Sequence, residues 1–388
     1  MAEFGFWEFF AGGGMARLGL GDAWNCLFAN DIDAKKGATY RANFQPAAEL
    51  IIDDIRTIAV EQLPAGATLA WASFPCQDLS LAGFGKGLKG DRSGAFWPFW
   101  RLMSHLKQRK EHPPIIVIEN VAGLITSHKG QDLHEIISVM VATGYRVGAI
   151  IIDAVHFVPQ SRPRLFLVAI DKRIRIPARL CSAVPQLQGH PANLIAAVTA
   201  LPDPLRKMWV WWKLPYPPLC SSTLLDIIED VPFGVNWHKR AETAKILSLM
   251  SPTNVEKVMK AKESNIRTIG TIYKRMRVDE HGQHVQRAEV RFDGISGCLR
   301  TPAGGSSRQT IIVVHGDEVR TRLISTREAA RLMGLPETYR LPQRYNDAYH
   351  LIGDGLAVPV VSWLERHLLN PLAQAASMPQ KAKERKYA

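Results

Sequence analysis

The sequence lacks a long uncharged apolar run, a closely spaced pair of cysteines and an internal repeat. A bilayer-spanning helix needs about 20 apolar residues, so we expect no membrane segment. The cysteines are Cys26, Cys76, Cys181, Cys220 and Cys298, with no C-x-x-C pair. Such scattering argues against a disulfide framework or a structural zinc site, and favours a reducing, cytoplasmic location. Residues 1–4 carry no basic leader before an apolar stretch, so we expect no secretion signal.

Length and charge indicate two lobes of different character. The chain has 388 residues, 46% of them hydrophobic, which is enough for a large core and two domains. The net charge is +12, of which residues 175–344 carry +10, whereas residues 1–174 and 345–388 carry +1 each. A nearly neutral segment joined to a strongly basic one favours a catalytic lobe and a lobe that binds a polyanion such as nucleic acid. A basic, solvated surface with no partner is the alternative.

The first 170 residues alternate short apolar runs with amphipathic stretches. The apolar runs cover residues 4–10, 69–73, 115–118, 147–152 and 165–170. The helix-like stretches between them include residues 34–44, 96–108 and 131–143. This alternation predicts an α/β fold with a mostly parallel sheet covered on both faces. Ligands of such sheets bind beyond the carboxyl ends of the strands, so turns that follow the strands should converge there.

This pattern ends near residue 175, where prolines and tryptophans gather. We therefore expect a catalytic and cofactor-binding domain over residues 1–174, completed by residues 345–372 that pack back onto it. Residues 175–344 should form a smaller, irregular domain with short strand-like pieces. Residues 373–388 should be a basic, mobile tail.

A glycine-rich turn, Phe10-Ala11-Gly12-Gly13-Gly14, follows the first apolar run. Glycines let a backbone turn tightly and approach a ligand closely. The dinucleotide pattern G-x-G-x-x-G is incomplete, because Arg17 stands at its last glycine. Asp31 or Asp33 lies at the end of a second predicted strand, where a carboxylate can accept hydrogen bonds from ribose hydroxyls. Asp53 and Asp54 supply another acid pair after a third apolar piece. An ordinary turn beside solvated acids remains an equal alternative.

Cys76 follows Pro75 and the apolar run at residues 69–73. A lone cysteine is usually a small buried apolar residue. Here the proline stiffens the turn, and the glycines at 83–87 allow a loop that closes over a substrate. A nucleophilic thiol needs help to ionise at neutral pH.

Glu119 ends the next apolar run, and Arg162 and Arg164 lie one residue apart beyond it. In a desolvated cleft the pKa of a carboxyl rises, so that it can present a proton to a ring nitrogen. Arginines at alternate strand positions point to the same face, where they can orient Glu119, bind a base oxygen or form structural ion pairs. Together and in this order, these residues suggest a thiolate that attacks a ring activated by an acid.

The set of motifs resembles the cytosine-C5 DNA methyltransferases of bacteria and phages. The matching motifs follow the family's order and are 10–14, 74–77, 119–121, 160–164, 326–332 and 353–355. The middle lobe lacks family motifs, as expected of the region that reads the target. The chain departs from the usual pattern at Met15, at Asp31, at His156-Phe157 and at Gly353-Asp354-Gly355. These departures concern cofactor contacts and leave the chemistry unchanged.

The resemblance implies a Rossmann-like sheet that binds S-adenosylmethionine. The cofactor residues that it implies are Phe10, Gly12, Gly14, Asp31, Ile32, Asp54, Ile55 and Pro75. The catalytic residues that it implies are Cys76 as the nucleophile, with Glu119, Arg162 and Arg164 around the cytosine. The implied reaction transfers a methyl group to C5 of a cytosine flipped out of a specific duplex DNA site, through a covalent Cys76–C6 intermediate and without a metal.

Base flipping costs a few kcal/mol, which phosphate contacts of the basic lobe can offset. Residues 300–309 are our favoured loop near DNA, with a plain hairpin connection as a nearly equal reading. An RNA cytosine methyltransferase and a DNA-binding protein without turnover remain rivals. We also expect a monomer, and pairing with a restriction endonuclease is open.

Overall fold

The largest element of the computed structural model, which describes residues 3–75, 94–278, 282–301 and 308–378, is a seven-stranded sheet. Its strand order is β3-β2-β1-β4-β5-β7-β6. Neighbouring strands are parallel, except that β7 runs antiparallel to both β5 and β6. The strands are β1 Phe4–Phe9, β2 Trp24–Asp31, β3 Leu50–Ile52, β4 Ala67–Ala72, β5 Ile115–Val121, β6 Tyr145–Asp153 and β7 Pro163–Asp171. The predicted α/β fold with a mostly parallel sheet is confirmed.

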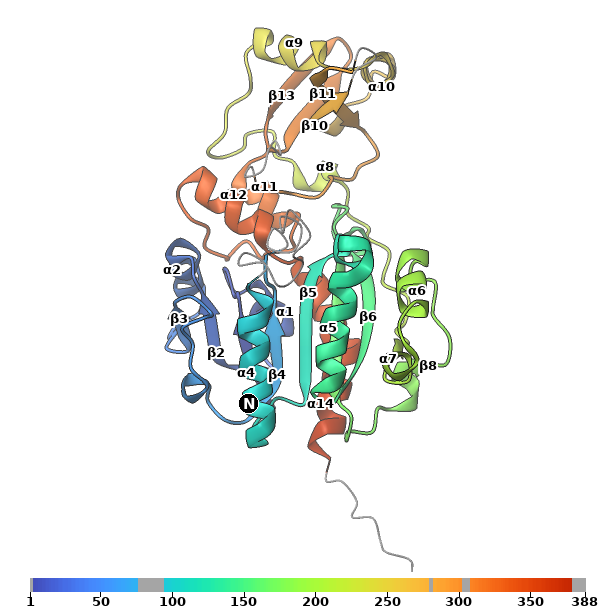
Figure 1. Ribbon diagram of the computed structural model, residues 1–388. Helices are drawn as coiled ribbons and strands as arrows, with labels where there is room; N and C mark the ends of the chain where they lie inside the picture. The colour runs from blue at the N-terminus through green and yellow to red at the C-terminus, as the bar shows by residue number, and fades with distance from the viewer. Residues whose placement is uncertain (1–2, 76–93, 279–281, 302–307, 379–388) are drawn as a thin grey trace, which may run out of the picture.

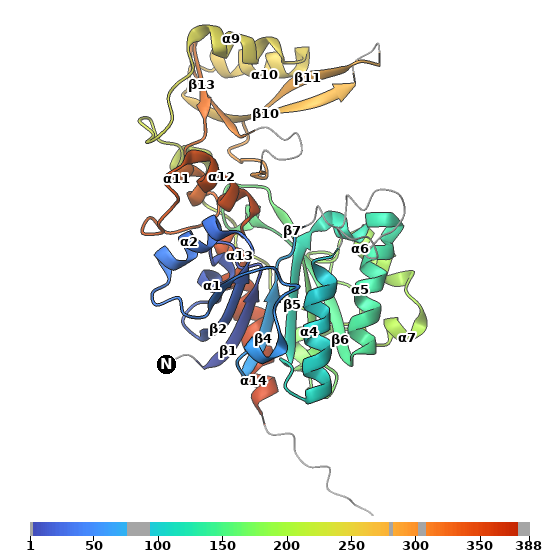
Figure 2. The ribbon, with the colours of Figure 1, turned by 60° about the vertical axis from the view of Figure 1, so that its left-hand side comes forward.

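Helices cover both faces of this sheet (Figure 2). Side chains alternate across a strand, so Leu69 and Trp71 of β4 join the core on one face, and Ala70 and Ala72 join the core on the other. The first core includes residues of α1 Met15–Leu20, α2 Ala34–Asn43, α13 Val358–Leu364 and α14 Asn370–Ser377. The second includes residues of α4 Phe96–Arg109, α5 Gln131–Ala142 and α6 Ala192–Thr199.

A second sheet forms most of the smaller lobe at the top of Figure 1. It is antiparallel, with the order β11-β10-β12-β13. Its strands are β10 Thr268–Val278, β11 His284–Arg291, β12 Thr310–His315 and β13 Glu318–Leu323. Helices α9 Arg240–Ser248 and α10 Pro252–Glu263 pack on one face through an apolar core that includes Ile246, Val258 and Ile272. The lobe is therefore more regular than the short strand-like pieces that we expected, and β10 alone has 11 residues.

The expected boundary at residue 175 needs correction, because the chain stays on the large sheet beyond it. Leu194 and Val198 of α6 are buried in the large lobe's core. The Val147 N–H donates to the Met208 carbonyl at 3.1 Å, and the Val210 N–H donates back to Val147 at 2.8 Å. The smaller lobe therefore begins after β9 Trp211–Trp212. The prolines around residues 185–204 concealed the apolar face of α6 in the sequence.

The end of the described chain returns to the first lobe. Helix α13 packs so closely on α1 that a Cβ at Gly19 would lie 2.4 Å from the Val361 Cβ. The Ser362 hydroxyl donates to the Gly19 carbonyl at 2.9 Å, and the Trp24 indole donates to the Glu365 carboxylate at 3.0 Å. Residues more than 300 positions apart thus complete one domain, and α1, which follows the glycine turn, is fixed in place.

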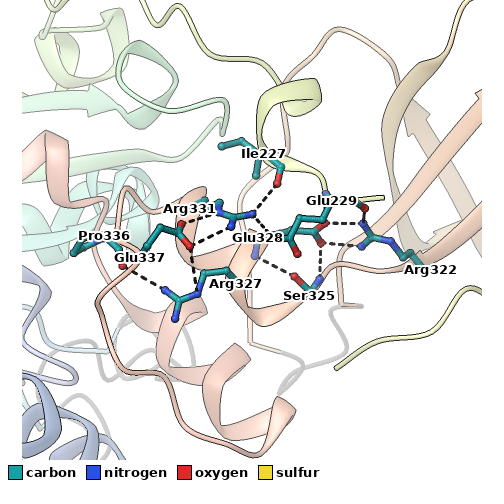
Figure 3. A network of polar contacts seen from close by, with 9 residues as sticks. All are labelled: Ile227, Glu229, Arg322, Ser325, Arg327, Glu328, Arg331, Pro336 and Glu337. Atoms are coloured by element: carbon teal, nitrogen blue, oxygen red, sulfur yellow. Dashed lines mark hydrogen bonds and ion pairs between the residues drawn. The ribbon is translucent and has the colours of Figure 1, made fainter. Parts of the chain in front are cut away.

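A buried polar network joins the second sheet to α11 Thr326–Arg331 (Figure 3). Arg322 of β13 and Glu328 of α11 are both fully buried and form a bidentate ion pair, with N–O distances of 2.6 and 2.8 Å. Glu328 also accepts hydrogen bonds from the Ser325 and Glu229 N–H groups, both at 2.8 Å. Arg331 binds the Glu229 carboxylate at 2.8 Å. The network therefore fixes the junction of the two lobes.

Candidate active site

The described candidate site residues gather at one edge of the large sheet because of strand direction. Strands β1 to β5 are parallel neighbours, so their carboxyl ends meet at this edge. Strand β7 runs the other way and begins there, with Arg164 opposite Val121 at the end of β5. The antiparallel strand thus brings Arg162 and Arg164 to Glu119.

The glycine turn at the end of β1 has a backbone that favours glycine. Phe10, Gly12 and Gly14 have φ angles of 59°, 55° and 78°, all in the left-handed region. The Gly12 N–H donates to Asp31 Oδ2 at 2.7 Å, and the Asp33 N–H donates to Asp31 Oδ1 at 2.8 Å. Burial raises the pKa of the Asp31 carboxyl. The Asp31 carboxylate therefore stabilises the conformation of the glycine turn.

Packing supports this turn on one side and leaves it open at Gly12. A Cβ at Gly14 would lie 2.3 Å from the Phe44 ring, and the Tyr339 hydroxyl donates to the Gly13 carbonyl at 2.7 Å. A Cβ at Gly12 would meet no described atom within 4 Å. The free space at Gly12 is where a ligand can approach the backbone.

The other expected cofactor residues line the ends of β2 and β3. Ile32 is 67% exposed, whereas Ile55 is buried. Asp54 pairs with Arg56, and the hydrogen bonds from Arg56 lower the pKa of the Asp54 carboxyl. The Asn30 side-chain amide donates to the Asp53 carbonyl at 2.9 Å, which ties the ends of the two strands together.

The chain after β4 is held from two sides. The Phe74 ring packs edge-on against Phe10, with centroids 6.2 Å apart. The Asn120 side-chain amide donates to the Phe74 carbonyl at 3.2 Å. Pro75 is exposed at the end of this described stretch, and the proposed nucleophile Cys76 lies outside the described residues. The segment that leads to Cys76 is thus anchored to the glycine turn and to the residue after Glu119.

Glu119 and Arg164 form the ion pair at the centre of the site. Arg164 Nε lies 3.1 Å from Glu119 Oε1, and Glu119 is only 7% exposed. Burial raises the pKa of the Glu119 carboxyl, although Arg164, Arg162 and a hydrogen bond from Ser73 each oppose this rise. A buried carboxyl with a raised pKa can hold and donate a proton near neutral pH.

Arg162 binds protein groups in this site through both terminal nitrogens. Its Nη1 donates to the Cys298 sulfur at 3.2 Å and to the Leu299 carbonyl at 2.9 Å. Its Nη2 donates to the carbonyls of Gly353 and Gly355 at 2.8 and 2.6 Å. Burial lowers the pKa of this guanidinium to about 10, which leaves it a cation at neutral pH. Arg162 therefore joins three segments of the cleft, and Arg164 is the arginine that contacts Glu119.

Gln160, which stood out in the sequence only as part of a motif, links Leu299 to Leu332 at the end of α11. Its amide nitrogen donates to the Leu332 carbonyl at 2.7 Å, and its oxygen accepts from the Leu299 N–H at 3.0 Å. The side chain is fully buried. A glutamine flanked by proline and serine gives no signal of this role in the sequence.

Glu8 of β1 was missed because it lies inside an apolar run. It is 1% exposed, and its Oε2 has no hydrogen-bond partner among the described residues. The Arg17 N–H approaches its other oxygen at 3.4 Å. Burial raises the pKa of this carboxyl to about 8, so it is mostly protonated at neutral pH beneath the glycine turn.

The described residues contain no cluster of His, Cys, Asp and Glu side chains that could hold a metal ion. Within the same ranges, no helix has the length and apolar character that a membrane crossing requires.

A family model, described as C-5 cytosine-specific DNA methylase, matches residues 4–370. The chain belongs to this family. It is a DNA cytosine-5-methyltransferase, and the predicted family and enzyme class are confirmed. The match spans both lobes and includes the edge of the sheet where Glu119 and Arg164 meet.

Two relatives and one solved structure that this methylase resembles each match almost the whole chain. Type II methyltransferase M.HpaII of Haemophilus parainfluenzae is 24% identical over 95% of this chain and 90% of its own length. Type II methyltransferase M.HgiCI of Herpetosiphon aurantiacus is 25% identical over 92% and 95%. The solved structure of the Entamoeba histolytica methyltransferase EhMeth has a TM-score of 0.59 at 15% identity and covers 97% of this chain and all of its own. That likeness supports the fold.

Proposed function

We propose that this methylase transfers a methyl group from S-adenosylmethionine to C5 of a cytosine flipped out of a specific duplex DNA site, through a bond between Cys76 and C6. The observation that carries the proposal is Glu119, a buried carboxyl with a raised pKa, paired with Arg164 at the sheet edge that also holds the glycine turn. We further propose that the enzyme acts as a monomer, and a restriction endonuclease is a possible functional partner.

The described residues fit S-adenosylmethionine. The backbone at Gly12 is accessible, the Asp31 carboxylate can accept hydrogen bonds from a ribose, and Phe10 offers an aromatic ring beside the turn. Ile32, Asp54, Ile55 and Pro75 complete the proposed set. When bound, this cofactor supplies an electrophilic methyl group on a sulfonium.

The protein's own groups activate the base. C5 of cytosine is a poor nucleophile, and addition of the Cys76 thiolate at C6 makes C5 an enamine carbon. Glu119 donates a hydrogen bond or proton to N3, which favours this addition and typically contributes ~10²–10⁴-fold. Arg164 orients Glu119, and Arg162 holds the cleft segments around it. After methyl transfer, solvent water takes the C5 proton, and the electron pair of that C–H bond re-forms the C5–C6 double bond. The C6–S bond then breaks, which releases the Cys76 thiolate, and the proton at N3 returns to Glu119.

The positive charge of the smaller lobe supports the binding of DNA between the two lobes. Residues 213–344, which form the smaller lobe, carry 21 Lys and Arg against 14 Asp and Glu, a net charge of +7. Phosphate contacts supply much of the affinity of DNA-binding proteins. A base inside the duplex is out of reach of a thiol, so the target must leave the stack at a cost of about a few kcal/mol. Contacts of the basic lobe offset this cost.

A covalent trap tests the proposal directly. Bisulfite sequencing of DNA from cells that express the protein first identifies the methylated site. Duplex DNA with fluorine at C5 of that cytosine is then incubated with enzyme and S-adenosylmethionine. Because fluorine cannot leave as a proton does, we expect a band of enzyme joined to DNA on a denaturing gel.

Two variants and one substrate serve as controls. Cys76→Ser should give no band and no labelled methyl transfer, yet bind DNA, whereas Cys220→Ser should behave like the wild type. Structured RNA should accept no methyl group. Preferred methylation of the RNA would favour the rival RNA methyltransferase, and methyl transfer by Cys76→Ser at the normal rate would refute the covalent mechanism.

A further inference from the structure

Cys298 stands in the catalytic charge cluster, although nothing in the proposed mechanism uses it. It lies in the segment that leads from the second sheet back to the cleft, and it is a free, half-buried cysteine. Its sulfur accepts from Arg162 Nη1 at 3.2 Å and lies 4.0 Å from Arg164 Nη2. The same Arg164 guanidinium reaches Glu119 through Nε at 3.1 Å. One cation is thus shared between a thiol and the proposed catalytic acid.

The position of Cys298 is fixed by the backbone on both sides. The Ser161 N–H donates to the Ser296 carbonyl at 2.8 Å, and the Ser296 N–H donates to the Pro159 carbonyl at 2.8 Å. The next residue, Leu299, binds Gln160 through its N–H and Arg162 through its carbonyl. The thiol therefore cannot leave the two arginines without breaking this ladder.

The arginines beside the sulfur lower the pKa of the Cys298 thiol, although its S–H can also donate to the Leu299 carbonyl at 3.4 Å. Burial alone would raise the pKa of the Cys298 thiol, but Arg162 and Arg164 outweigh it, and the pKa falls below its ordinary value. The groups that face the thiol from each packed element are Arg162, Arg164, Arg300, Tyr273 of β10 and Tyr349 of α12 Tyr345–Asp354. Both tyrosines have raised pKa values, mainly through burial, and are neutral at working pH. The net field at the sulfur is that of the arginines.

We infer that Cys298 is a positioning residue of the methyl-transfer site, whose thiolate shares Arg164 with Glu119 and so keeps the catalytic proton on Glu119. The inference rests on the proposed function of Glu119. Without the thiolate, two guanidiniums would face one carboxyl and would favour its ionised form. With the thiolate present, a second anion balances them, and the carboxyl stays protonated to higher pH.

The test is the pH profile of single-turnover methyl transfer for the wild type, Cys298→Ser, Cys298→Ala and Cys298→Asp. The rates of the two neutral variants, Cys298→Ser and Cys298→Ala, should begin to fall at a lower pH than the rate of the wild type. The alkaline limb of their pH profiles should therefore lie ~0.5–1 pH unit lower. This shift corresponds to about a 3–10-fold lower rate on that limb, because each unit of pKa is a factor of ten. Cys298→Asp restores an anion and should return the limb toward the wild-type position.

A second measurement examines the thiol without relying on turnover. Wild-type protein is treated with iodoacetamide between pH 6 and 9, where the thiolate displaces iodide to form a thioether, and the Cys298 peptide is quantified by mass spectrometry. Half-maximal alkylation should occur below the ordinary cysteine range near ~8.5. Thermal unfolding of each variant shows that it is folded.

The outcomes separate the two proposals. Absence of methyl transfer by the wild type would overturn the proposed function itself. Superimposable profiles of the wild type and Cys298→Ser, or a uniform loss of rate at every pH that Cys298→Asp does not restore, would overturn the role of Cys298 alone. Alkylation of Cys298 only at ordinary thiol pH would do the same.

Discussion

Replacing Glu328 by glutamine should loosen the junction of the two lobes. The change keeps the shape of the side chain but removes the charge that faces Arg322, and both residues are fully buried. The new NH₂ group must also face a donor, because Arg322, Ser325 N–H and Glu229 N–H all donate to the present carboxylate. An uncompensated buried cation typically costs about 3–5 kcal/mol. We expect a loss of this size in the free energy of unfolding of the smaller lobe.

Urea unfolding followed by circular dichroism measures this loss. Glu337→Gln is the matched control, because Glu337 binds Arg331 at 2.7 Å in the same network but its side chain is 61% exposed. Exposed pairs contribute at most about 1 kcal/mol, so the control should change little. The double variant Arg322→Met/Glu328→Gln should recover part of the loss, because no buried cation remains. A loss for Glu328→Gln no larger than that of Glu337→Gln would falsify the reasoning.

Three further predictions concern the catalytic edge. Glu119→Gln should lower the rate of single-turnover methyl transfer by ~10²–10⁴-fold, whereas DNA binding in a gel-shift assay should persist. The rate of the wild type should fall as pH rises through the raised pKa of Glu119. Folding raises the pKa of Glu8 to about 8, so the free energy of unfolding should decline between pH ~4.5 and 8 by up to ~1.4 kcal/mol per pH unit. Urea titrations of the wild type and Glu8→Gln across this range measure this decline. A difference in unfolding free energy between the two proteins that does not change with pH would contradict the prediction. Gly14→Ala should lower the melting temperature more than Gly12→Ala, since only the first Cβ meets the Phe44 ring, and equal melting temperatures would count against this packing.

The sequence predicted the large sheet well, because the alternation of strands and helices is a local signal. Phe10 follows β1, Asp31 ends β2, and Glu119 lies two residues before the end of β5. Parallel strands bring such ends together whatever the details of packing. The roles of individual site residues, including Cys76, stay predictions. Asp31 shows why, since the contact of its carboxylate with Gly12 depends on the exact fold of the turn.

Other features depend on contacts between distant segments, which a single sequence does not reveal. Cys298 reaches Arg162 across 136 positions, and Trp24 reaches Glu365 across 341. Glu8 lies in an apolar run, and the sequence does not tell whether its carboxyl is buried in the core or lies as a charge at the edge of a strand. The lobe boundary was misplaced because α6 is short and flanked by prolines, although Leu194 and Val198 carry a four-residue spacing.

The attachment of the smaller lobe has a consequence for how this protein can diversify. The lobe is held at its base by Gln160, which binds Leu299, and by the Arg322–Glu328 pair. Neither attachment involves β11, which is the edge strand opposite β13, or its neighbour β10. Ala288 of β11 is fully buried in the lobe's apolar core, so an exchange of the β10–β11 hairpin should keep it and replace residues 275–287 alone, which leaves that core and the catalytic groups in place. Grafting experiments that seek a new target preference should cut within this hairpin and leave both anchors intact.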